Sequence, residues 1–423
     1  MRRPRVIIVG AGFGGLACSR SLAKAPVHVV LIDRNNYHLF TPLLYQVASS
    51  LLNPSDIVFP VRQVFRRSSH IEFVYGEVMG VDLAGQVVRL SDHRTILYDF
   101  LVLATGSQTN FYGMESVERL AYGLKDLSEA LELRNHVLRC FENATAAGLA
   151  PDRQRWLTFV VVGGGPTGVE YAGALSELVH LELSRDFPAL DMRQVRIVLV
   201  EGEDRVLPAF AESLGMDTSR RLQERYGIEV RVGERVTEAE SGSVCLAGGG
   251  RIEAETLVWA AGVRPSELAS HVDSPTSRSG RLSVSESLRL PGQDRVYAIG
   301  DLAAADHEGG EAPMLSAPAI QAGRTVARSI RRQLKGEKPV PFAYRDKGIM
   351  ATIGRSNAVA QVGRFRLKGF PGWIAWLAVH LYYILGVRNR IAVLSGWAWN
   401  YLFRDRPIRL IARARARETP ADR

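Results

Sequence analysis

Near its start the chain has a short apolar run over residues 5–9 that stops at glycine, and this segment limits the possible folds more than any other. Apolar residues then recur at helical spacing, so this order predicts a β-strand, a tight turn and an α-helix. Gly10 permits the turn, Gly12 lets the backbone approach a pyrophosphate, and Gly15 lets the helix pack closely on the strand. Free N–H groups at the start of the helix complete an anion site. The segment predicts a dinucleotide site, and the plainer alternative is a glycine-rich turn.

An acidic residue follows at the spacing that such a site requires. Asp33 ends a second apolar run, residues 29–32, about 20 positions after the glycines, where a carboxylate can bond the ribose hydroxyls. A glycine triad alone is weak evidence. Strand, glycines, helix, second strand and terminal acid within one short unit favour a nucleotide site over a simple turn.

The same order of features occurs again in the middle of the chain. Residues 158–162 lead into a second set of glycines, and a later apolar strand ends at Glu201. The interval between them is long because residues 179–192 look inserted at the end of the helix. The run 257–259 also echoes residues 101–103, and small residues and a glycine follow both. The repetition indicates two dinucleotides or two halves of an internal duplication.

Other segments predict the rest of the sheet framework. Residues 71–82 alternate well enough to be one strand, with residues 87–97 as its partner. A late strand ends in Gly300 and Asp301, where an aspartate can bond a ribityl hydroxyl of a flavin; the plainer alternative is a turn or cap. A helix is predicted over residues 318–334.

Charge and cysteine content narrow the class of protein. The net charge of +9 suggests an anionic partner, which can be nucleic acid, an acidic protein or a membrane surface. The three cysteines, Cys18, Cys140 and Cys245, lie far apart, which argues against a disulfide framework, a metal cluster and a dithiol centre. We therefore expect no metal site. The first residues run straight into the first strand without room for a signal peptide, so we expect a cytoplasmic protein.

The last part of the chain has a different composition. Residues 370–403 hold four of the six tryptophans in two apolar runs, each too short to span a bilayer. From residue 370 onward there are nine Arg and Lys residues against three acids, so this region carries +6 of the net charge. Tryptophans beside arginines are typical of helices that lie in a membrane surface. The plainer alternative is a core helix or a dimer interface.

Taken together, the two nucleotide units, the paired strand ends and the late Gly-Asp resemble the two-dinucleotide-binding flavoprotein fold. Within it the chain resembles the type II NADH:quinone oxidoreductases over nearly its whole length. The more specific motifs are residues 40–46, 162–170, 258–264 and 344–348, together with the aromatic, arginine-flanked tail. The resemblance implies FAD at the first site, NADH at the second and a membrane quinone as acceptor.

The expected fold class is α/β, with two Rossmann-like dinucleotide-binding domains and a C-terminal membrane-docking region. We expect an FAD-binding domain from residues 1–112 and 284–337, an NADH-binding domain from 113–283 and a membrane-anchoring region from 338–423. The expected location is the cytoplasmic face of the cell membrane, held peripherally through an anionic lipid surface. No nucleic-acid partner is expected, and a homodimer is left open.

The motifs and the resemblance together assign a set of residues to cofactor binding. They are Gly10, Gly12, Phe13, Gly14, Gly15, Asp33, Arg34, Thr41, Pro42, Val78, Ala104, Thr105, Gly106, Gly163, Gly165, Pro166, Thr167, Gly168, Glu201, Ala261, Gly262, Gly300, Asp301, Ser316 and Ala317. Members of this family often carry an Ala-Gln pair near the flavin, where this chain has Ser316-Ala317. The details of quinone contact are therefore open.

Three residues are assigned to catalysis. Glu170, on the helix after the second glycine loop, is expected to face the nicotinamide and flavin rings and to orient the nucleotide or pass a proton to reduced quinone; favourable interaction with the helix dipole is the plainer alternative. Lys347 and Gln321 are expected at the quinone end of the site. Their plainer alternatives are a solvated lysine and an ordinary surface glutamine.

Three rival functions share some of these features. A soluble FAD-dependent NAD(P)H reductase or oxidase that uses a protein carrier or oxygen shares every nucleotide motif but does not require the aromatic tail. Sulfide:quinone reductase shares the tail but needs closely placed redox cysteines. A basic, nucleic-acid-binding flavoprotein would interleave aromatic and basic residues, whereas here the aromatics lie in apolar runs.

Overall fold

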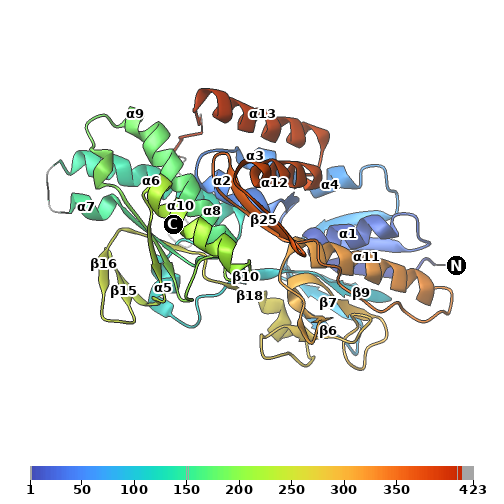
Figure 1. Ribbon diagram of the computed structural model, residues 1–423. Coiled ribbons are helices and arrows are strands. Elements are labelled where there is room, and N and C mark those ends of the chain that lie inside the picture. Colours follow the sequence, from blue (N-terminus) through green and yellow to red (C-terminus); the bar gives the residue numbers. More distant parts are fainter. Residues whose placement is uncertain (1, 149, 151, 407, 412–423) are drawn as a thin grey trace, which may run out of the picture.

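Two parallel β-sheets of the same plan form the framework of the computed structural model, which describes residues 2–148, 150, 152–406 and 408–411. The first sheet has the order β20-β9-β1-β2-β5 and the second β17-β11-β12-β13. Figure 1 shows the first sheet in the right half of the molecule and the second in the left half. The first sheet contains β1 (Arg5–Val9), β2 (His28–Asp33), β5 (Ile71–Tyr75), β9 (Phe100–Leu103) and β20 (Val296–Ala298); the second contains β11 (Thr158–Val162), β12 (Arg196–Glu201), β13 (Glu229–Val232) and β17 (Thr256–Trp259).

The two sheets correspond strand by strand. In each, the strand before the glycines pairs in parallel with the strand that ends in the acid and with a later apolar strand. The echo between residues 101–103 and 257–259 is thus structural, since β9 and β17 hold the same place in their sheets. Strands buried on both faces read as continuous apolar runs, as β1 and β11 do. The predicted fold class and internal duplication are confirmed.

Helices cover both sheets and join the two halves. In the first half α1 (Phe13–Leu22) packs against α11 (Ser316–Gln333), so closely that a Cβ at Gly323 would lie 2.3 Å from the Gly14 carbonyl oxygen. In the second half α8 (Pro166–Glu177) continues into a π-helix, Leu178–Leu183, and α9 (Ser184–Asp186). Two further long helices are α6 (Leu127–Ala146) and α10 (Glu212–Tyr226).

Small antiparallel sheets flank the parallel ones. The strand predicted over residues 71–82 is divided at Gly76 and Glu77: β5 joins the parallel sheet, whereas β6 (Val78–Asp82) pairs with β7 (Val87–Leu90). The single-strand prediction was wrong there because one alternating pattern covers two strands of different sheets. The second half has a matching sheet, and β10 (Ser107–Thr109) pairs with β18 (Val263–Pro265) across the two halves. The remaining strands of these sheets are β8 (Thr95–Leu97), β14 (Val236–Glu240), β15 (Ser243–Leu246) and β16 (Arg251–Glu253).

The C-terminal region forms its own layer over the junction of the two halves. It begins with the antiparallel strands β24 (Ile349–Gly354), β25 (Asn357–Val362) and β26 (Phe365–Lys368). The helices α12 (Gly369–Tyr383) and α13 (Val387–Phe403) follow, shown in red at the upper side of Figure 1. Within the described part of the chain, no helix combines the length and apolar character that crossing a membrane requires.

Short elements complete the fold. They are β3 (Tyr37–Leu39), a 3₁₀ turn (Thr41–Leu43), α2 (Leu44–Ala48), α3 (Pro54–Ile57), β4 (Val58–Pro60), α4 (Val61–Val64), α5 (Glu115–Leu120), α7 (Arg153–Trp156), a 3₁₀ turn (Met192–Gln194), a 3₁₀ turn (Glu267–His271), β19 (Leu282–Ser283), a 3₁₀ turn (Gly300–Leu302), β21 (Ala303–Ala304), β22 (Asp306–His307) and β23 (Gly310–Glu311).

Candidate functional site

The turn between β1 and α1 has the geometry that its glycines predict. Gly10 has φ +104°, and a Cβ there would lie 2.3 Å from the carbonyl oxygen of Ala104. A Cβ at Gly15 would lie 1.8 Å from the Gly10 carbonyl oxygen. At Gly12 a Cβ would meet no atom within 4 Å, so this backbone faces open space. The turn is therefore packed on its protein side and open on the other, as a phosphate cradle must be.

Asp33 stabilises this turn from the end of β2. Its carboxylate accepts the N–H of Ala11 at 2.6 Å and the N–H of Asn35 at 2.6 Å. Burial raises the pKa of Asp33, and the two amide bonds act in the opposite direction. The aspartate thus shapes the loop, and its predicted contact with ribose hydroxyls stays a prediction.

A cleft of about 390 Å³ runs from this turn to the start of α11. Of the residues predicted to bind the first cofactor, the cleft is lined by Gly10, Gly12, Phe13, Gly14, Asp33, Arg34, Thr41, Val78, Ala104, Thr105, Gly106, Gly300, Asp301 and Ser316. Three others lie outside the lining. Gly15 is buried in the packing of α1 on β1, Pro42 is in the 3₁₀ turn before α2, and Ala317 is in the first turn of α11. The cleft has the size of a small-molecule site.

Two residues that the sequence did not indicate complete the cleft at Asp301. The Ser107 hydroxyl donates to the Asp301 carboxylate at 2.5 Å, and the Lys125 ammonium lies 3.6 Å from it. Ser107 follows the small-residue strand end, which is a weak signal. Lys125 precedes the capping box of α6 and gives no signal in the sequence, since only the fold brings it to Asp301.

The second glycine turn repeats the first almost atom for atom. Gly163 has φ +106°, and its Cβ would lie 2.5 Å from the Ala260 carbonyl oxygen. A Cβ at Gly168 would lie 1.8 Å from the Gly163 carbonyl oxygen. Glu201 accepts the N–H of Gly164 at 2.5 Å and that of Glu203 at 2.8 Å. The second unit therefore has the same turn geometry, with a glutamate in the place of the aspartate.

The other residues predicted for the second site lie around this turn. Gly165 is half-buried, and Pro166 and Thr167 are exposed. Pro166 is the first residue of α8, where its missing N–H costs nothing. Ala261 and Gly262 follow β17, and the Tyr112 hydroxyl donates to the Ala261 carbonyl oxygen at 3.1 Å. The structure thus brings all of them to one end of the second sheet.

Glu170 is buried and faces the C-terminal region. Its Oε1 accepts the backbone N–H of Thr352 on β24 at 3.1 Å. Burial raises the pKa of the carboxyl to about 8, and the Thr352 N–H and the nearby Trp376 indole oppose the shift. A carboxyl with such a pKa is poised to take up or release a proton near neutral pH. The residues that line the cleft do not include Glu170.

Gln321 and Lys347 are joined through one backbone segment. The Gln321 amide donates to the Arg345 carbonyl oxygen at 2.9 Å and accepts the Arg345 N–H at 3.0 Å. Both ends of the amide are therefore occupied, so Gln321 holds the segment that carries Lys347. Lys347 itself is exposed.

A second, smaller cavity lies between the helices α12 and α13 and the two halves. Its volume is about 50 Å³. Aromatic residues of the C-terminal helices, Trp373, Trp376, Trp397 and Tyr401, form one wall. Tyr45 and Gln46, from the motif at residues 40–46, form the opposite wall with Thr352. Local sequence patterns did not predict that this motif meets the tail.

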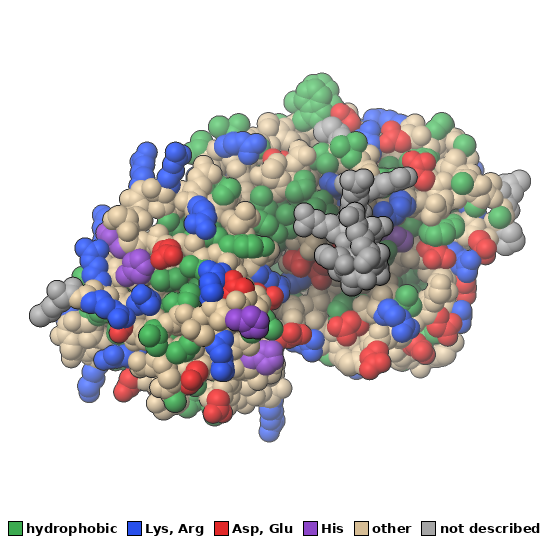
Figure 2. Space-filling model, turned by 180° about the vertical axis from the view of Figure 1, so that it is seen from behind, with side chains coloured by type: hydrophobic (Ala, Val, Ile, Leu, Met, Phe, Trp, Pro, Cys, Tyr) green, Lys and Arg blue, Asp and Glu red, His purple; other side chains and the backbone are tan. Residues whose placement is uncertain are grey.

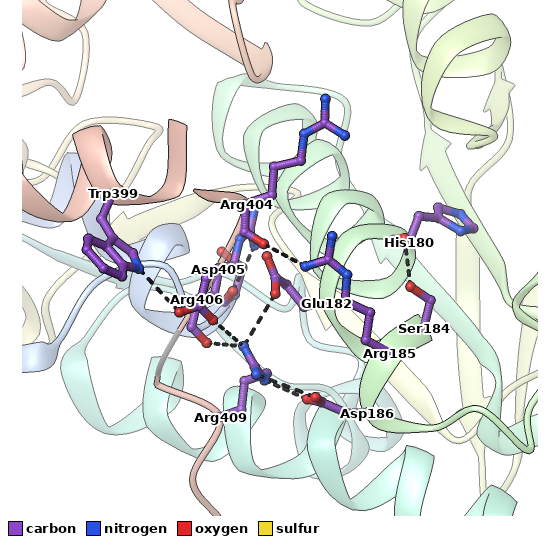
Figure 3. A network of polar contacts seen from close by, with 11 residues as sticks. His180, Glu182, Ser184, Arg185, Asp186, Trp399, Arg404, Asp405, Arg406 and Arg409 are labelled. Atoms are coloured by element: carbon purple, nitrogen blue, oxygen red, sulfur yellow. Dashed lines mark hydrogen bonds and ion pairs between the residues drawn. The ribbon is translucent and has the colours of Figure 1, made fainter. Parts of the chain in front are cut away.

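The chain after α13 returns to the second half and is fixed there by arginines (Figure 3). Arg406 is 1% exposed, and its guanidinium lies 2.9 Å from the Glu177 carboxylate and donates to the carbonyl oxygens of Ser49 and Ala174. Arg409 lies 2.6 Å from the Asp186 carboxylate and 3.5 Å from that of Glu182.

This arrangement corrects part of the predicted tail. The sequence predicts Arg406 and Arg409 as cations for a membrane surface, but both form ion pairs with carboxylates of the protein. Arg390 donates to the carbonyl oxygens of Ile384 and Tyr382 at the end of α12. Arg404 is exposed, and Figure 3 shows its guanidinium turned away from these carboxylates. The predicted cations at positions 413, 415 and 417 lie outside the described residues.

The helices α12 and α13 expose large apolar side chains. Hydrophobic side chains gather along the upper edge in Figure 2, the edge at which α13 lies in Figure 1. The large hydrophobic residues exposed on these helices are Phe370, Ile374, Val379, Tyr382, Tyr383, Val387, Ile391, Leu394, Trp399, Tyr401, Leu402 and Phe403, which we call the apolar face. Large apolar side chains exposed together in this way are typical of an interaction site.

The comparisons with known proteins agree with this geometry. The family model described as pyridine nucleotide-disulphide oxidoreductase matches residues 4–323. The chain is 38% identical over 415 residues to the type II NADH:quinone oxidoreductase Ndh of Mycobacterium tuberculosis, covering 95% of this chain and 89% of the relative. It is 32% identical over 371 residues to the type II NADH:quinone oxidoreductase of Staphylococcus aureus, covering 85% and 90%. NDH2 from Plasmodium falciparum, solved in complex with NADH, has a TM-score of 0.87 at 20% identity, covering 95% of this chain and 99% of that one.

Proposed function

The chain belongs to the pyridine nucleotide-disulphide oxidoreductase family and, within it, to the type II NADH:quinone oxidoreductases, and we propose that it oxidises NADH with a bound FAD and reduces a membrane quinone, without pumping protons. The observation that carries the proposal is the pair of matched glycine turns, each with its own acid, beneath an apolar helical layer. One turn serves FAD and the other NADH. The residues 1–112 and 284–337 form the FAD-binding domain, 113–283 the NADH-binding domain and 338–423 the anchoring region.

The cleft of the first half fits FAD. The open backbone at Gly12 suits a pyrophosphate, and Asp301, held by Ser107 and Lys125, suits a ribityl hydroxyl. When bound there, FAD supplies the two-electron chemistry that lets NADH reduce a quinone. The protein's own contribution is to bind, orient and shield.

The second unit binds NADH in preference to NADPH. Glu201 stands where a carboxylate bonds the ribose diol and repels a 2′-phosphate. Arg205 and Arg235 are nearby, but each lies close to an acid of its own, Asp204 and Glu203.

Three residues serve the reacting end. Glu170 orients the nucleotide or supplies the proton that a reduced quinone takes up, which its pKa of about 8 permits. Lys347 acts at the quinone end, and Gln321 positions the segment that carries it. Lys347→Ala and Gln321→Ala should therefore raise the KM for quinone more than the KM for NADH, with Lys335→Ala as an exposed-lysine control; the opposite pattern contradicts the assignment.

The apolar face holds the protein on the cytoplasmic surface of the membrane without crossing it. Burial of apolar side chains supplies most of the binding. Among the described residues of α12, α13 and the segment after them, Arg388, Arg390 and Arg404 are exposed and none forms an ion pair with a carboxylate of the protein. Each adds about 1 kcal/mol near an anionic surface. High salt should therefore loosen the protein only slightly, and detergent should be needed to release it.

The spectrum of the purified protein tests the proposal. A flavin spectrum that NADH bleaches, with turnover only when a quinone analogue is added, is the expected result. Turnover with oxygen or a soluble protein carrier, but not with the quinone analogue, would favour the soluble reductase instead.

A further inference from the structure

A continuous chain of hydrogen bonds joins the helix α13 to Glu170. The Trp397 indole N–H donates to Gln46 Oε1 at 2.8 Å, and Gln46 Nε2 donates to the Tyr45 hydroxyl at 2.9 Å. The Tyr45 hydroxyl shares a hydrogen bond of 2.9 Å with Thr352 Oγ1. The Thr352 backbone N–H then donates to Glu170. The chain thus crosses from the apolar helical layer, through α2 and β24, to α8.

Every residue in this series of hydrogen bonds is buried. The five residues are between 4% and 8% exposed. A buried polar side chain that loses its partner costs about 1–3 kcal/mol, so each bond is held in place by the next. Gln46 has both ends of its amide satisfied only while Trp397 and Tyr45 keep their positions.

A second residue of the helical layer reaches the same carboxyl. Trp376 on α12 is 1% exposed, and its Nε1 has no acceptor at hydrogen-bonding geometry among the described residues. Its indole is nevertheless close enough to Glu170 to affect the carboxyl. Trp376 also packs against Trp397, with ring centroids 5.6 Å apart, so α12 and α13 meet at this point.

Of the titratable groups packed around Glu170, only Glu170 is expected to change its charge near neutral pH. On α12, burial lowers the pKa of His380 to about 4, so it is neutral. On α2 and α10, burial raises the pKa of Tyr45 and of Tyr226 above the usual value, so both are neutral. Further along α8, Glu177 is bound by Arg406 and by the Arg355 backbone N–H.

We propose that Trp397, Gln46 and Tyr45 are positioning residues for Glu170: they tie its carboxyl through Thr352 to the membrane-facing helices, so that the seating of α12 and α13 sets where the carboxyl lies. The inference rests on the proposed role of Glu170. It assigns to the C-terminal helices a part in the chemistry in addition to anchoring. The Glu170 carboxyl keeps its position only while α12 and α13 pack against the rest of the protein as described.

The sign of the effect follows from the hydrogen bond at the end of the chain. A donated N–H favours the charged form of a carboxyl. Breaking the chain frees Thr352, weakens its N–H bond to Glu170 and should raise the pKa of Glu170 further. We expect an increase of about half a unit or more.

Infrared difference spectroscopy of the purified, flavin-loaded protein during a pH titration measures the pKa of Glu170 directly. The measurement does not depend on turnover. The protonated carboxyl band that Glu170→Gln removes identifies the group. Tyr45→Phe and Gln46→Met nearly keep the shape of the side chain and remove its hydrogen-bonding group, whereas Trp397→Phe removes the indole N–H together with one of the two rings. Each should move the midpoint of that band to higher pH. The pH profile of flavin reduction by NADH should move with it.

Tyr171→Phe is the matched control. Tyr171 is fully buried and is next to Glu170 on α8, but its hydroxyl has no hydrogen-bond partner among the described residues. Its midpoint should equal that of the unmodified protein. Unmoved midpoints in the three chain variants, with Glu170→Gln still removing the band, would overturn the positioning role alone. A band unaffected by Glu170→Gln would overturn the role of Glu170, and the inference with it.

Discussion

The two nucleotide units and the C-terminal helical layer differ in which atoms set the geometry of the site. In the units, the geometry is in the backbone: Gly10 and Gly163 have φ of +104° and +106°, and each faces a carbonyl oxygen that a Cβ would strike. In the C-terminal layer the geometry is in side chains, where a buried arginine, an aromatic wall and an apolar face act together. A substitution at a glycine of the turn should therefore abolish the site, whereas a single substitution in the C-terminal layer should weaken its function only in part.

The largest effect should come from the turns. Gly10→Ala puts a Cβ 2.3 Å from a backbone oxygen at positive φ, a strain of about 3 kcal/mol or more, and should yield protein without bound flavin. Gly163→Ala meets the same obstacle but should keep flavin and raise the KM for NADH more than about tenfold. Flavin absorbance and NADH titration separate the two variants.

Gly12→Ala is the control for this comparison. Its new methyl meets no protein atom, so stability should hold while flavin binding weakens. Equal effects of all three changes on stability and flavin binding would contradict the distinction.

Removing the buried arginine should be the next largest change. Arg406→Met leaves the Glu177 carboxylate buried without its cation, which costs about 3–5 kcal/mol. We expect the Tm to fall by about 5–10 °C, and Glu177→Gln in the same chain should recover much of it. Arg404→Met, two residues away and exposed, should leave the Tm unchanged. A chain ended near residue 369 would remove Arg406 as well, so it does not isolate anchoring.

Charges on the apolar face should act on membrane binding alone. Val387, Ile391 and Leu402 are 62–72% exposed on α13. Changing each to Glu should weaken binding to anionic vesicles by about tenfold or more, because each loses about 1.5–3 kcal/mol of apolar burial. Leu97→Glu introduces the same charge at an exposed leucine of β8, away from these helices, and should bind as before. If Leu97→Glu weakens binding equally, overall charge and not the apolar face is responsible.

The smallest effect should be on nucleotide choice. Glu201→Ala removes the repulsion of a 2′-phosphate and should narrow the kcat/KM preference for NADH over NADPH by about tenfold or less. The change is limited because Arg205 and Arg235 already have acidic neighbours. Comparable kcat/KM values for the two nucleotides in the unmodified protein would refute the preference itself.

The comparison also explains what the sequence revealed. Both glycine turns, the acids Asp33 and Glu201 and the duplicated sheets follow from local patterns, because a dinucleotide turn is encoded by adjacent residues. Local patterns did not reveal that Arg406 is buried or that Gln46 meets Trp397, since these contacts join residues 229 and 351 positions apart. Lys125 at Asp301 is a case of the same kind. An arginine-rich tail predicts a solvated surface from sequence alone, because only the fold brings Glu177 to Arg406.

The most direct test of the whole account is an anaerobic stopped-flow experiment on the protein bound to anionic vesicles. NADH should bleach the flavin absorbance, and quinone carried in the vesicles should restore it, with the restoration slowed in Leu402→Glu as binding to the vesicles weakens. Flavin that NADH bleaches, but that vesicle quinone fails to reoxidise while oxygen or a soluble carrier succeeds, would contradict the account.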